Sequence, residues 1–323
     1  MTAETCTIRQ SAAAILTMAM ALAGGAWAQP PQFGGNQPEF VRQGQQMLRE
    51  GKPEEALALY QTVLKANPDS LPAHNAAGIA LDLMGKGDEA RQHFQKAIDL
   101  APNAGAKANA QRAMAMSWAF SGNCKETVRY EQMVIQYYIQ QKDFYNQGEM
   151  ADEAARVCID NGDFETAYQW YLTGHDLGLK QPDIPADRKS LWEFRWEHAQ
   201  ARVAARRGNY TEAEKHVKAA QAILEKDPEM ARQQAVFFPY LVGYVALYHG
   251  DYKTALEQLQ KANQNDPFIQ CLIGDTYERL GEKEKATEYY RKASKSTAHN
   301  PPAAYAVPYT RKKLAGDQPG TKG

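Results

Sequence analysis

The chain has 323 residues, of which 44% are hydrophobic, so it is long enough to bury a substantial core. Its 37 lysines and arginines nearly balance its 38 aspartates and glutamates, which leaves a formal net charge of −1. Because the molecule carries no overall positive field, its composition gives no support to a nucleic-acid-binding or anionic-membrane-binding function.

The N-terminus has the pattern of an export signal. Arg9 precedes an apolar run over residues 12–23, and Ala26 and Ala28 supply the small residues of a cleavage site after Ala28. The run is shorter than the roughly 20 residues that a membrane-spanning helix needs. We therefore expect a signal peptide over residues 1–28 and a periplasmic or secreted mature chain without a membrane span. Residues 29–37, rich in proline and glycine, are expected to form a disordered lead-in.

A repeated pair of small residues organises the rest of the chain. Seven times a glycine is followed five residues later by alanine, or once by Thr127. The first two units recur at a spacing of 34 residues, whereas the later turn glycines are 31 to 46 residues apart. A repeat of this size is typical of stacked helix–turn–helix units. The seven turn glycines are Gly51, Gly85, Gly122, Gly162, Gly208, Gly250 and Gly281.

Each residue of the repeat has a physical role in such a stack. Small side chains let two antiparallel helices approach closely, and a large side chain nine residues after the turn, such as Tyr60 or Phe94, fills the space beside them. A proline such as Pro68 ends the second helix because it lacks the N–H that would continue it. Unit three departs most from this pattern, with Thr127 and Glu131 at the alanine and aromatic positions.

From about Pro38 to Lys295 these residues resemble the tetratricopeptide repeat. The resemblance implies an all-α fold, an α-α superhelix of about seven helix pairs over residues 38–295. We expect residues 296–314 to form a capping segment with a short helix, and residues 315–323 to be a disordered tail. The resemblance to this family also implies a scaffold. Its concave face, lined by the first helix of each pair, would bind a protein or peptide partner.

Motifs of catalysis and cofactor binding are not found in the sequence. The seven histidines form no metal-binding arrangement, and no phosphate-binding loop or nucleophile elbow occurs. The most irregular insertion, residues 180–188, contains neither histidine nor cysteine. We therefore expect no enzyme activity, no cofactor and no metal site.

The cysteines are informative because an exported chain folds in an oxidising compartment. Cys124 follows the turn of unit three, and Cys158 precedes the turn of unit four. In a helical stack the start of one helix then meets the end of its antiparallel neighbour, which predicts a Cys124–Cys158 disulfide. The alternative is a pair of buried thiols that pack as small hydrophobic groups. Cys271 is left over and is expected to be unpaired.

A partner-binding surface is predicted from helical spacing. Residues thirteen, ten, six and three positions before each turn glycine share one face of the first helix, which points into the concavity. In units five and six this face combines basic and aromatic side chains, which favours a groove for an extended segment with an acidic group. In the alternative, the aromatic side chains are core residues. The predicted partner-binding residues are Arg195, His198, Arg202, Phe237, Tyr240, Tyr244 and Tyr248.

Two functions stay open at this stage. The first is a non-catalytic exported scaffold that binds a peptide or protein partner in its groove. The second is a structural component of cell-envelope or outer-membrane complexes that has no defined peptide ligand. The lysine and asparagine clamp with which some family members hold a carboxylate tail is missing, since units one and two carry Val41, Gln45, Asn75 and Ile79 at the inward positions. If the groove lies elsewhere, the surface around Asn75 and Ile79 is the next candidate.

Overall fold

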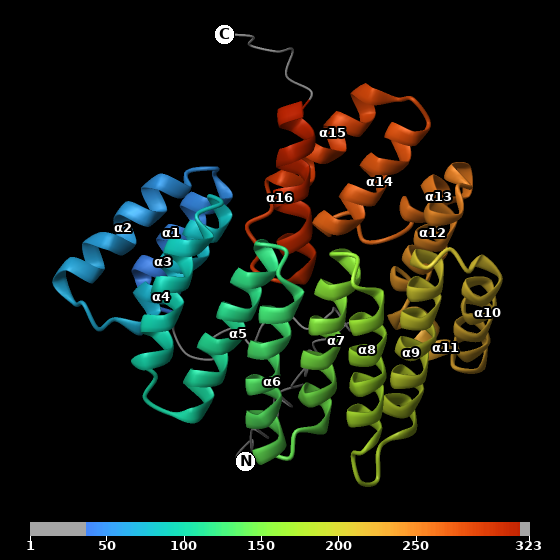
Figure 1. Cartoon of the computed structure of the whole chain (residues 1–323), viewed down its shortest axis with the longest axis horizontal. Helices are drawn as coiled ribbons and strands as arrows, with labels where there is room; N and C mark the ends of the chain where they lie inside the picture. Colours follow the sequence, from blue (N-terminus) through green and yellow to red (C-terminus); the bar gives the residue numbers. More distant parts are fainter. Residues whose placement is uncertain (1–36, 317–323) are drawn as a thin grey trace, which may run out of the picture.

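The computed structural model describes residues 37–316, and this part of the chain consists of helices and their connections, without strands. Fourteen of its sixteen helices form seven consecutive pairs, as predicted, and Figure 1 shows the pairs side by side in a curved array. The predicted signal peptide, the lead-in up to residue 36 and the tail from residue 317 lie outside the described residues. The helices are α1 (Glu39–Arg49), α2 (Pro53–Ala66), α3 (Leu71–Leu83), α4 (Gly87–Asp99), α5 (Ala104–Phe120), α6 (Cys124–Gln140), α7 (Phe144–Asp160), α8 (Phe164–Leu179), α9 (Ala186–Arg206), α10 (Tyr210–Lys226), α11 (Pro228–Gln233), α12 (Phe237–His249), α13 (Tyr252–Leu259), α14 (Pro267–Arg279), α15 (Lys283–Ser294) and α16 (Pro301–Gly316).

The seven turn glycines end the first helices of the pairs. All seven have a left-handed backbone with φ between 69° and 90°, which a side chain would make unfavourable. The N–H after the glycine bonds back to the helix; in unit one Lys52 donates to the carbonyl of Met47 at 2.9 Å. In four units the next residue also caps the second helix by accepting a hydrogen bond from a backbone N–H. These capping residues are Asn123, Asp163, Asn209 and Asp251.

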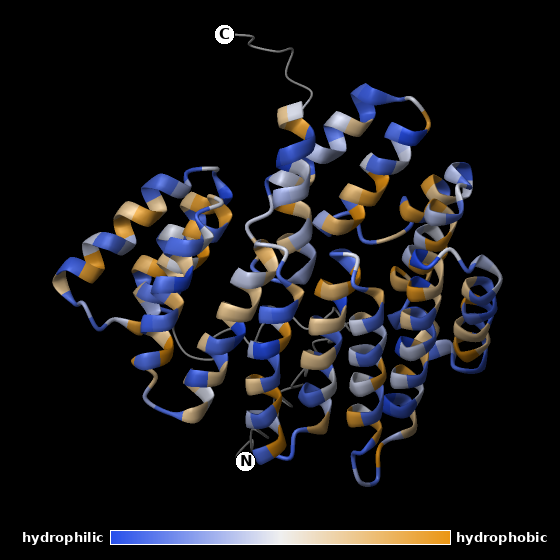
Figure 2. Ribbon diagram, viewed as in Figure 1, coloured by the Kyte–Doolittle hydropathy of each residue, from blue (hydrophilic) through white to orange (hydrophobic). Residues whose placement is uncertain are grey.

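The small residues lie at close helix crossings, as the repeat predicted. The six alanines of the pattern are at most 3% exposed. In unit one a Cβ added to Gly44 would lie 2.1 Å from the Tyr60 hydroxyl oxygen, so the glycine makes room for the ring of the second helix. Figure 2 shows hydrophobic and hydrophilic residues alternating along α2, as expected for a helix with one face in the core. The six alanines are Ala56, Ala90, Ala167, Ala213, Ala255 and Ala286.

Unit three keeps the same packing with polar side chains. Thr127 is fully buried and its hydroxyl donates to backbone carbonyls, at 2.9 Å to that of Asn123. Glu131 is also fully buried, and its carboxylate accepts no hydrogen bond in the structure. Burial raises the pKa of Glu131 well above its ordinary value, because the charged carboxylate loses its contact with water.

Cys124 and Cys158 are joined by a disulfide in the structure, with 4.9 Å between their Cα atoms. Cys124 is the first residue of α6, and Cys158 lies near the end of α7, which packs against α6. The bridge therefore ties unit three to unit four at the end of the stack that carries the turn glycines. Cys271 is a free and buried thiol on α14.

The last helix does more than cap the last unit. Asn300 accepts a hydrogen bond from the N–H of Ala303 at 3.1 Å, and Pro301 and Pro302 occupy the first turn, where a missing N–H costs little. The resulting helix α16 packs against α14 and α15 of the last unit, but also against α5 and α7 of units three and four. Figure 1 shows α16 between the N-terminal pairs and α14. A helix at this place was predicted, whereas its contacts with α5 and α7 were not.

Candidate functional site

The predicted basic strip on α9 lies inside the molecule. Arg195 forms an ion pair with Glu149 of α7, and its guanidinium lies 3.4 Å from the Tyr145 hydroxyl. Burial alone would lower the pKa of Arg195, but the Glu149 carboxylate more than offsets that effect and holds the pKa above its ordinary value. This arginine is therefore charged and engaged with a neighbouring helix of its own chain.

His198 does not add a positive charge to this strip. The side chain is 2% exposed and its ring lies 5.2 Å from that of Tyr240. Burial, reinforced by the positive charge of Arg202, lowers the pKa of His198 well below its ordinary value. The imidazole is consequently neutral at physiological pH.

Arg202 and Arg206 lie one turn apart on α9, and both side chains point toward α12. Arg202 is 1% exposed, donates to the Tyr240 hydroxyl at 3.4 Å and lies 5.0 Å from the centre of the Tyr171 ring. Arg206 donates to the Tyr244 hydroxyl at 3.3 Å. Charged guanidinium groups on aromatic faces are a favourable way to bury a cation. The two arginines thus hold α9 to α12 instead of facing an open groove.

The aromatic strip on α12 is largely buried, which agrees with the alternative that these aromatic side chains are core residues. Tyr240 and Tyr244 are 3% and 0% exposed, whereas Phe237 and Tyr248 are partly buried at its ends. The physical reason is the winding of the array, which brings unit four against units six and seven. Arg156 of α7 lies 4.7 Å from the centre of the Phe268 ring on α14. Spacing within one helix predicted the shared face correctly but could not show that later units would cover it.

A small cavity is left between α7, α8, α9 and α12. Its volume is about 40 Å³, enough for one or a few water molecules. Asp152 of α7 lines it, and burial raises the pKa of this carboxyl to about 8. The predicted residues that share this lining are Arg195, His198, Arg202 and Phe237.

Helix α16 covers the adjoining part of the concave face. Ala304 packs with Ala119 of α5 and Val157 of α7. Ahead of the helix, His299 bonds to the Asp82 carboxylate of α3 at 2.9 Å and stacks on the Phe120 ring. The segments joined by this bond are 217 residues apart, and no periodic signal in the sequence could have paired them.

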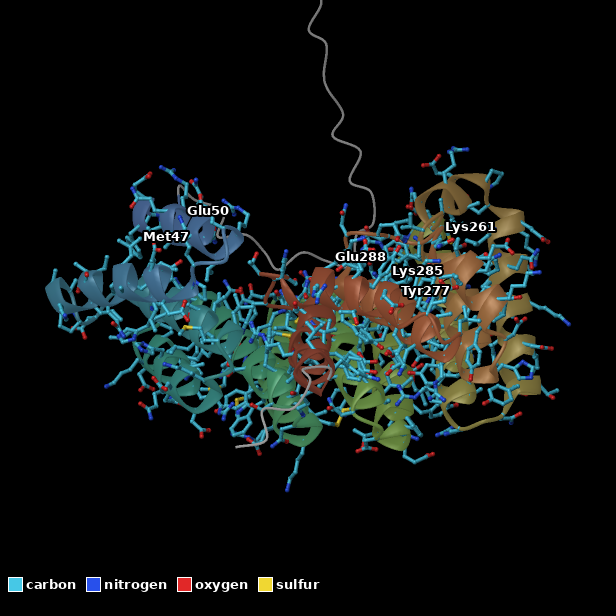
Figure 3. The ribbon with its side chains drawn as sticks, turned by 90° about the horizontal axis from the view of Figure 1, so that it is seen from above. Met47, Glu50, Lys261, Tyr277, Lys285 and Glu288 are labelled. Atoms are coloured by element: carbon cyan, nitrogen blue, oxygen red, sulfur yellow. A yellow bond between two sulfur atoms is a disulfide. The ribbon has the colours of Figure 1, made fainter. Side chains whose placement is uncertain are left out.

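The first helices of units one and two form the part of the concave face that is more open. Val41, Gln45 and Ile79 are partly exposed at the inward positions. Asn75 beside them is 6% exposed, and its side-chain oxygen accepts no hydrogen bond in the structure. Figure 3 places Met47 and Glu50 of α1 at one end of the array and Lys261 and Tyr277 at the other, with α16 between. This open face is the second candidate surface that the sequence indicated.

Residues 37–316 were also considered as a possible metal-binding or membrane-spanning region. No group of three or more histidine, cysteine, aspartate or glutamate side chains there is placed to hold a metal ion. None of the helices in the same range combines the length and the apolar character that crossing a membrane requires.

Comparisons with known proteins agree with this fold. Tetratricopeptide repeat models match residues 41–105 and 269–300. The uncharacterized protein y4yS of Sinorhizobium fredii is 32% identical over 71 residues, which is 22% of this chain and only 39% of that protein. The solved structure of RapI in its apo form superposes with a TM-score of 0.51 at 12% identity, covering 86% of this chain and 98% of RapI. A tetratricopeptide repeat protein from Parabacteroides merdae gives 0.48 at 14% identity, covering 84% of this chain and 98% of that one.

Tetratricopeptide repeats generally serve as non-catalytic scaffolds for protein interaction, and the regular packing of α1–α4 and α14–α15 coincides with the two matched segments. The glycine, alanine and aromatic positions that these units share are the ones that close the helix pairs in the structure. Residues 41–105 and 269–300 therefore contain tetratricopeptide repeats, and the described chain folds as an array of helix pairs of the same kind.

Proposed function

We propose that this protein is an exported scaffold that binds a peptide or protein partner through the open concave face of units one and two. The observation that carries the proposal is the contrast along the concave face. The inward side chains of units four to seven are mostly buried, whereas Val41, Gln45 and Ile79 keep contact with solvent. A partner reaches only an accessible surface, so the open units are favoured.

The chemistry of this face suits an extended peptide. Val41 and Ile79 supply apolar contact, and Asn75 supplies an amide whose oxygen has no hydrogen-bond partner. A buried unsatisfied polar atom costs about 1–3 kcal/mol. A backbone N–H of a bound peptide would remove that cost once the amide turns toward the groove, so binding gains a polar contact as well as apolar burial.

Export is supported by two independent features. Residues 1–28 have the pattern of a signal peptide. The Cys124–Cys158 disulfide is of a kind that persists in oxidising compartments and is rare in the cytosol of ordinary cells. The test is mass spectrometry of the chain expressed in its host. We expect the mature N-terminus at Gln29 and no free thiol at Cys124 or Cys158; an uncleaved chain with both thiols alkylatable would contradict the proposal.

Partner binding is tested by selecting peptides from a displayed random library on the folded protein and then measuring affinities for variants. Ile79→Arg should weaken the selected peptides at least tenfold, because it places a charge in the apolar part of the face. Met133→Arg is the matched control, since Met133 is 37% exposed on α6, away from this face. Equal affinity of the two variants for the selected peptides would show that the binding site lies elsewhere. Failure to select any peptide would favour a structural role without a defined peptide ligand.

A further inference from the structure

Helix α16 is attached to its two neighbours in different ways. Toward the last unit, the Tyr309 hydroxyl donates to Asp275 at 2.7 Å and Lys313 pairs with Glu278 at 2.5 Å. On the same side Ala306 is fully buried against Cys271 and Ala293. These polar bonds and the close packing fasten α16 to α14 and α15.

The side of α16 that faces units two to four is packed less completely. Its apolar contact places Ala304 against Ala119 and Val157, with the ring of Phe120 packed beside them. A cavity of about 180 Å³ lies along this contact between α5, α7 and α16, and a second one of about 50 Å³ lies toward the turn after α3. Where these cavities lie, the facing side chains do not touch, so this interface gains fewer dispersion contacts than a fully packed one would.

The surface beneath this loose contact belongs to the concave face. Ala119 occupies the position three residues before the turn glycine of unit three, and Asp82 the same position in unit two. Asp160 also lines the larger cavity. Its side-chain oxygens accept no hydrogen bond, and its carboxylate lies 3.9 Å from the Arg156 guanidinium. The covered surface is thus apolar, with the carboxylates of Asp82 and Asp160 at its edge, and of these two only Asp160 accepts no hydrogen bond.

We propose that the ends of α3, α5 and α7 now covered by α16 form an interaction surface for a helix of a partner protein, and that α16 is a built-in competitor for it. The inference rests on the proposed scaffold function and extends it along the concave face. In the closed state α16 occupies the surface with its Ala304 side. In the open state α16 stays on α14 and α15 while this side separates from α5 and α7.

The kind of partner follows from what α16 places on this surface. A competing helix needs a small side chain where Ala304 packs directly on Ala119 and Val157, whereas longer side chains beside that position can enter the adjoining cavity. It also needs a hydrogen-bonding or cationic group near its start to reach Asp82, as His299 does. Because α16 is tethered, its effective concentration is of the order of millimolar, and a free helix must overcome that advantage.

The proposal is tested with a fluorescent peptide that copies residues 296–316, added to the full chain and followed by anisotropy. The wild type should bind it weakly because α16 already covers the surface. Ala304→Arg places a long charged side chain at the loose contact and leaves the Ala306 side unchanged, so it should bind the peptide at least tenfold more tightly. Ala315→Arg, an exposed substitution on the same helix, is the matched control and should behave as wild type.

A second substitution locates the binding. Ala119→Arg added to Ala304→Arg should abolish the gain, because it blocks the surface itself. If Ala304→Arg melts cooperatively but binds no better than wild type, or if it loses its helical circular dichroism, α16 is a permanent part of the core and the proposal is overturned. The probe is the chain's own sequence, so that failure would leave peptide binding at Ile79, and with it the proposed function, untouched.

Discussion

The first two units and units four to seven are built from the same repeat but bury different chemistry. In α1–α4 the core is a cluster of alanines, leucines and the rings of Tyr60 and Phe94. In units four to seven the concave face becomes a second interior, which contains Asp152, Arg156 and Arg202 at 7%, 2% and 1% exposure. The first kind of core is local to neighbouring helices, whereas the second needs units distant in sequence to meet.

This difference teaches that a repeat fixes the contacts between neighbouring helices but not those across the superhelix. Arg156 reaches Phe268 only because unit seven turns back toward unit four. Burying charges in this way is costly unless they are paired or stacked on rings. The C-terminal half should therefore be the more sensitive to single substitutions and to pH.

The largest effect is expected at Tyr244. The ring is fully buried between Arg206 and the aromatic neighbours of α12 and α14, so Tyr244→Ala should lower the free energy of unfolding by about 3–5 kcal/mol. Tyr244→Phe is the control, because it keeps the ring and removes only the hydroxyl, at a cost of about 1 kcal/mol. Urea unfolding measures both. Stability unchanged by the alanine substitution would mean that the ring faces an open groove after all.

Reduction of the disulfide should have the next largest effect. The bridge closes a loop with a sequence separation of 34, for which chain entropy gives a stabilisation of about 4 kcal/mol. The Cys124→Ala/Cys158→Ala variant should melt at a clearly lower temperature, and a reducing agent should lower the midpoint of the wild type but not of the variant. Equal midpoints for the oxidised wild type and the variant would show that the bridge adds nothing to the contact between α6 and α7.

The buried carboxyl of Asp152 should make stability depend on pH. Its folded pKa is raised from 3.8 to about 8, so the protonated form stabilises the folded state fully below pH 3.8, and this contribution is lost as pH rises through about 8. Asp152→Asn cannot ionise, so near neutral pH it should be more stable than wild type by a few kcal/mol. At pH 4 the two should be nearly equal. A difference that stays constant from pH 4 to pH 8 would contradict this account.

The smallest effect is expected in the regular N-terminal half. Ala90 is fully buried at the crossing of α3 and α4, and Ala90→Leu should overpack it and cost about 1–3 kcal/mol. Gln92→Leu adds a similar side chain at an exposed position of the same helix and should change stability little. If the thermal midpoints of the two variants coincide, the assigned register of the repeat is incorrect.

The sequence was sufficient for features that depend on near neighbours. The turn glycines, the buried alanines and the meeting of Cys124 with Cys158 all follow from where one helix ends and the next begins. The groove prediction used the same spacing and found the correct face of α9 and α12. It left open whether these side chains are buried, because the helical period of one unit does not report what a later unit places over that face.

By itself, then, the sequence determined the all-helical array, its seven pairs and their register, since small residues at fixed spacing permit only one close crossing of adjacent helices. Tertiary structure alone decided which concave residues stay accessible. Curvature accumulates over several units, and it brings α7 to α14 and carries α16 back onto α5. The hydrogen bond between His299 and Asp82 joins the C-terminal segment to unit two, and the repeat pattern gives no reason to pair these two side chains.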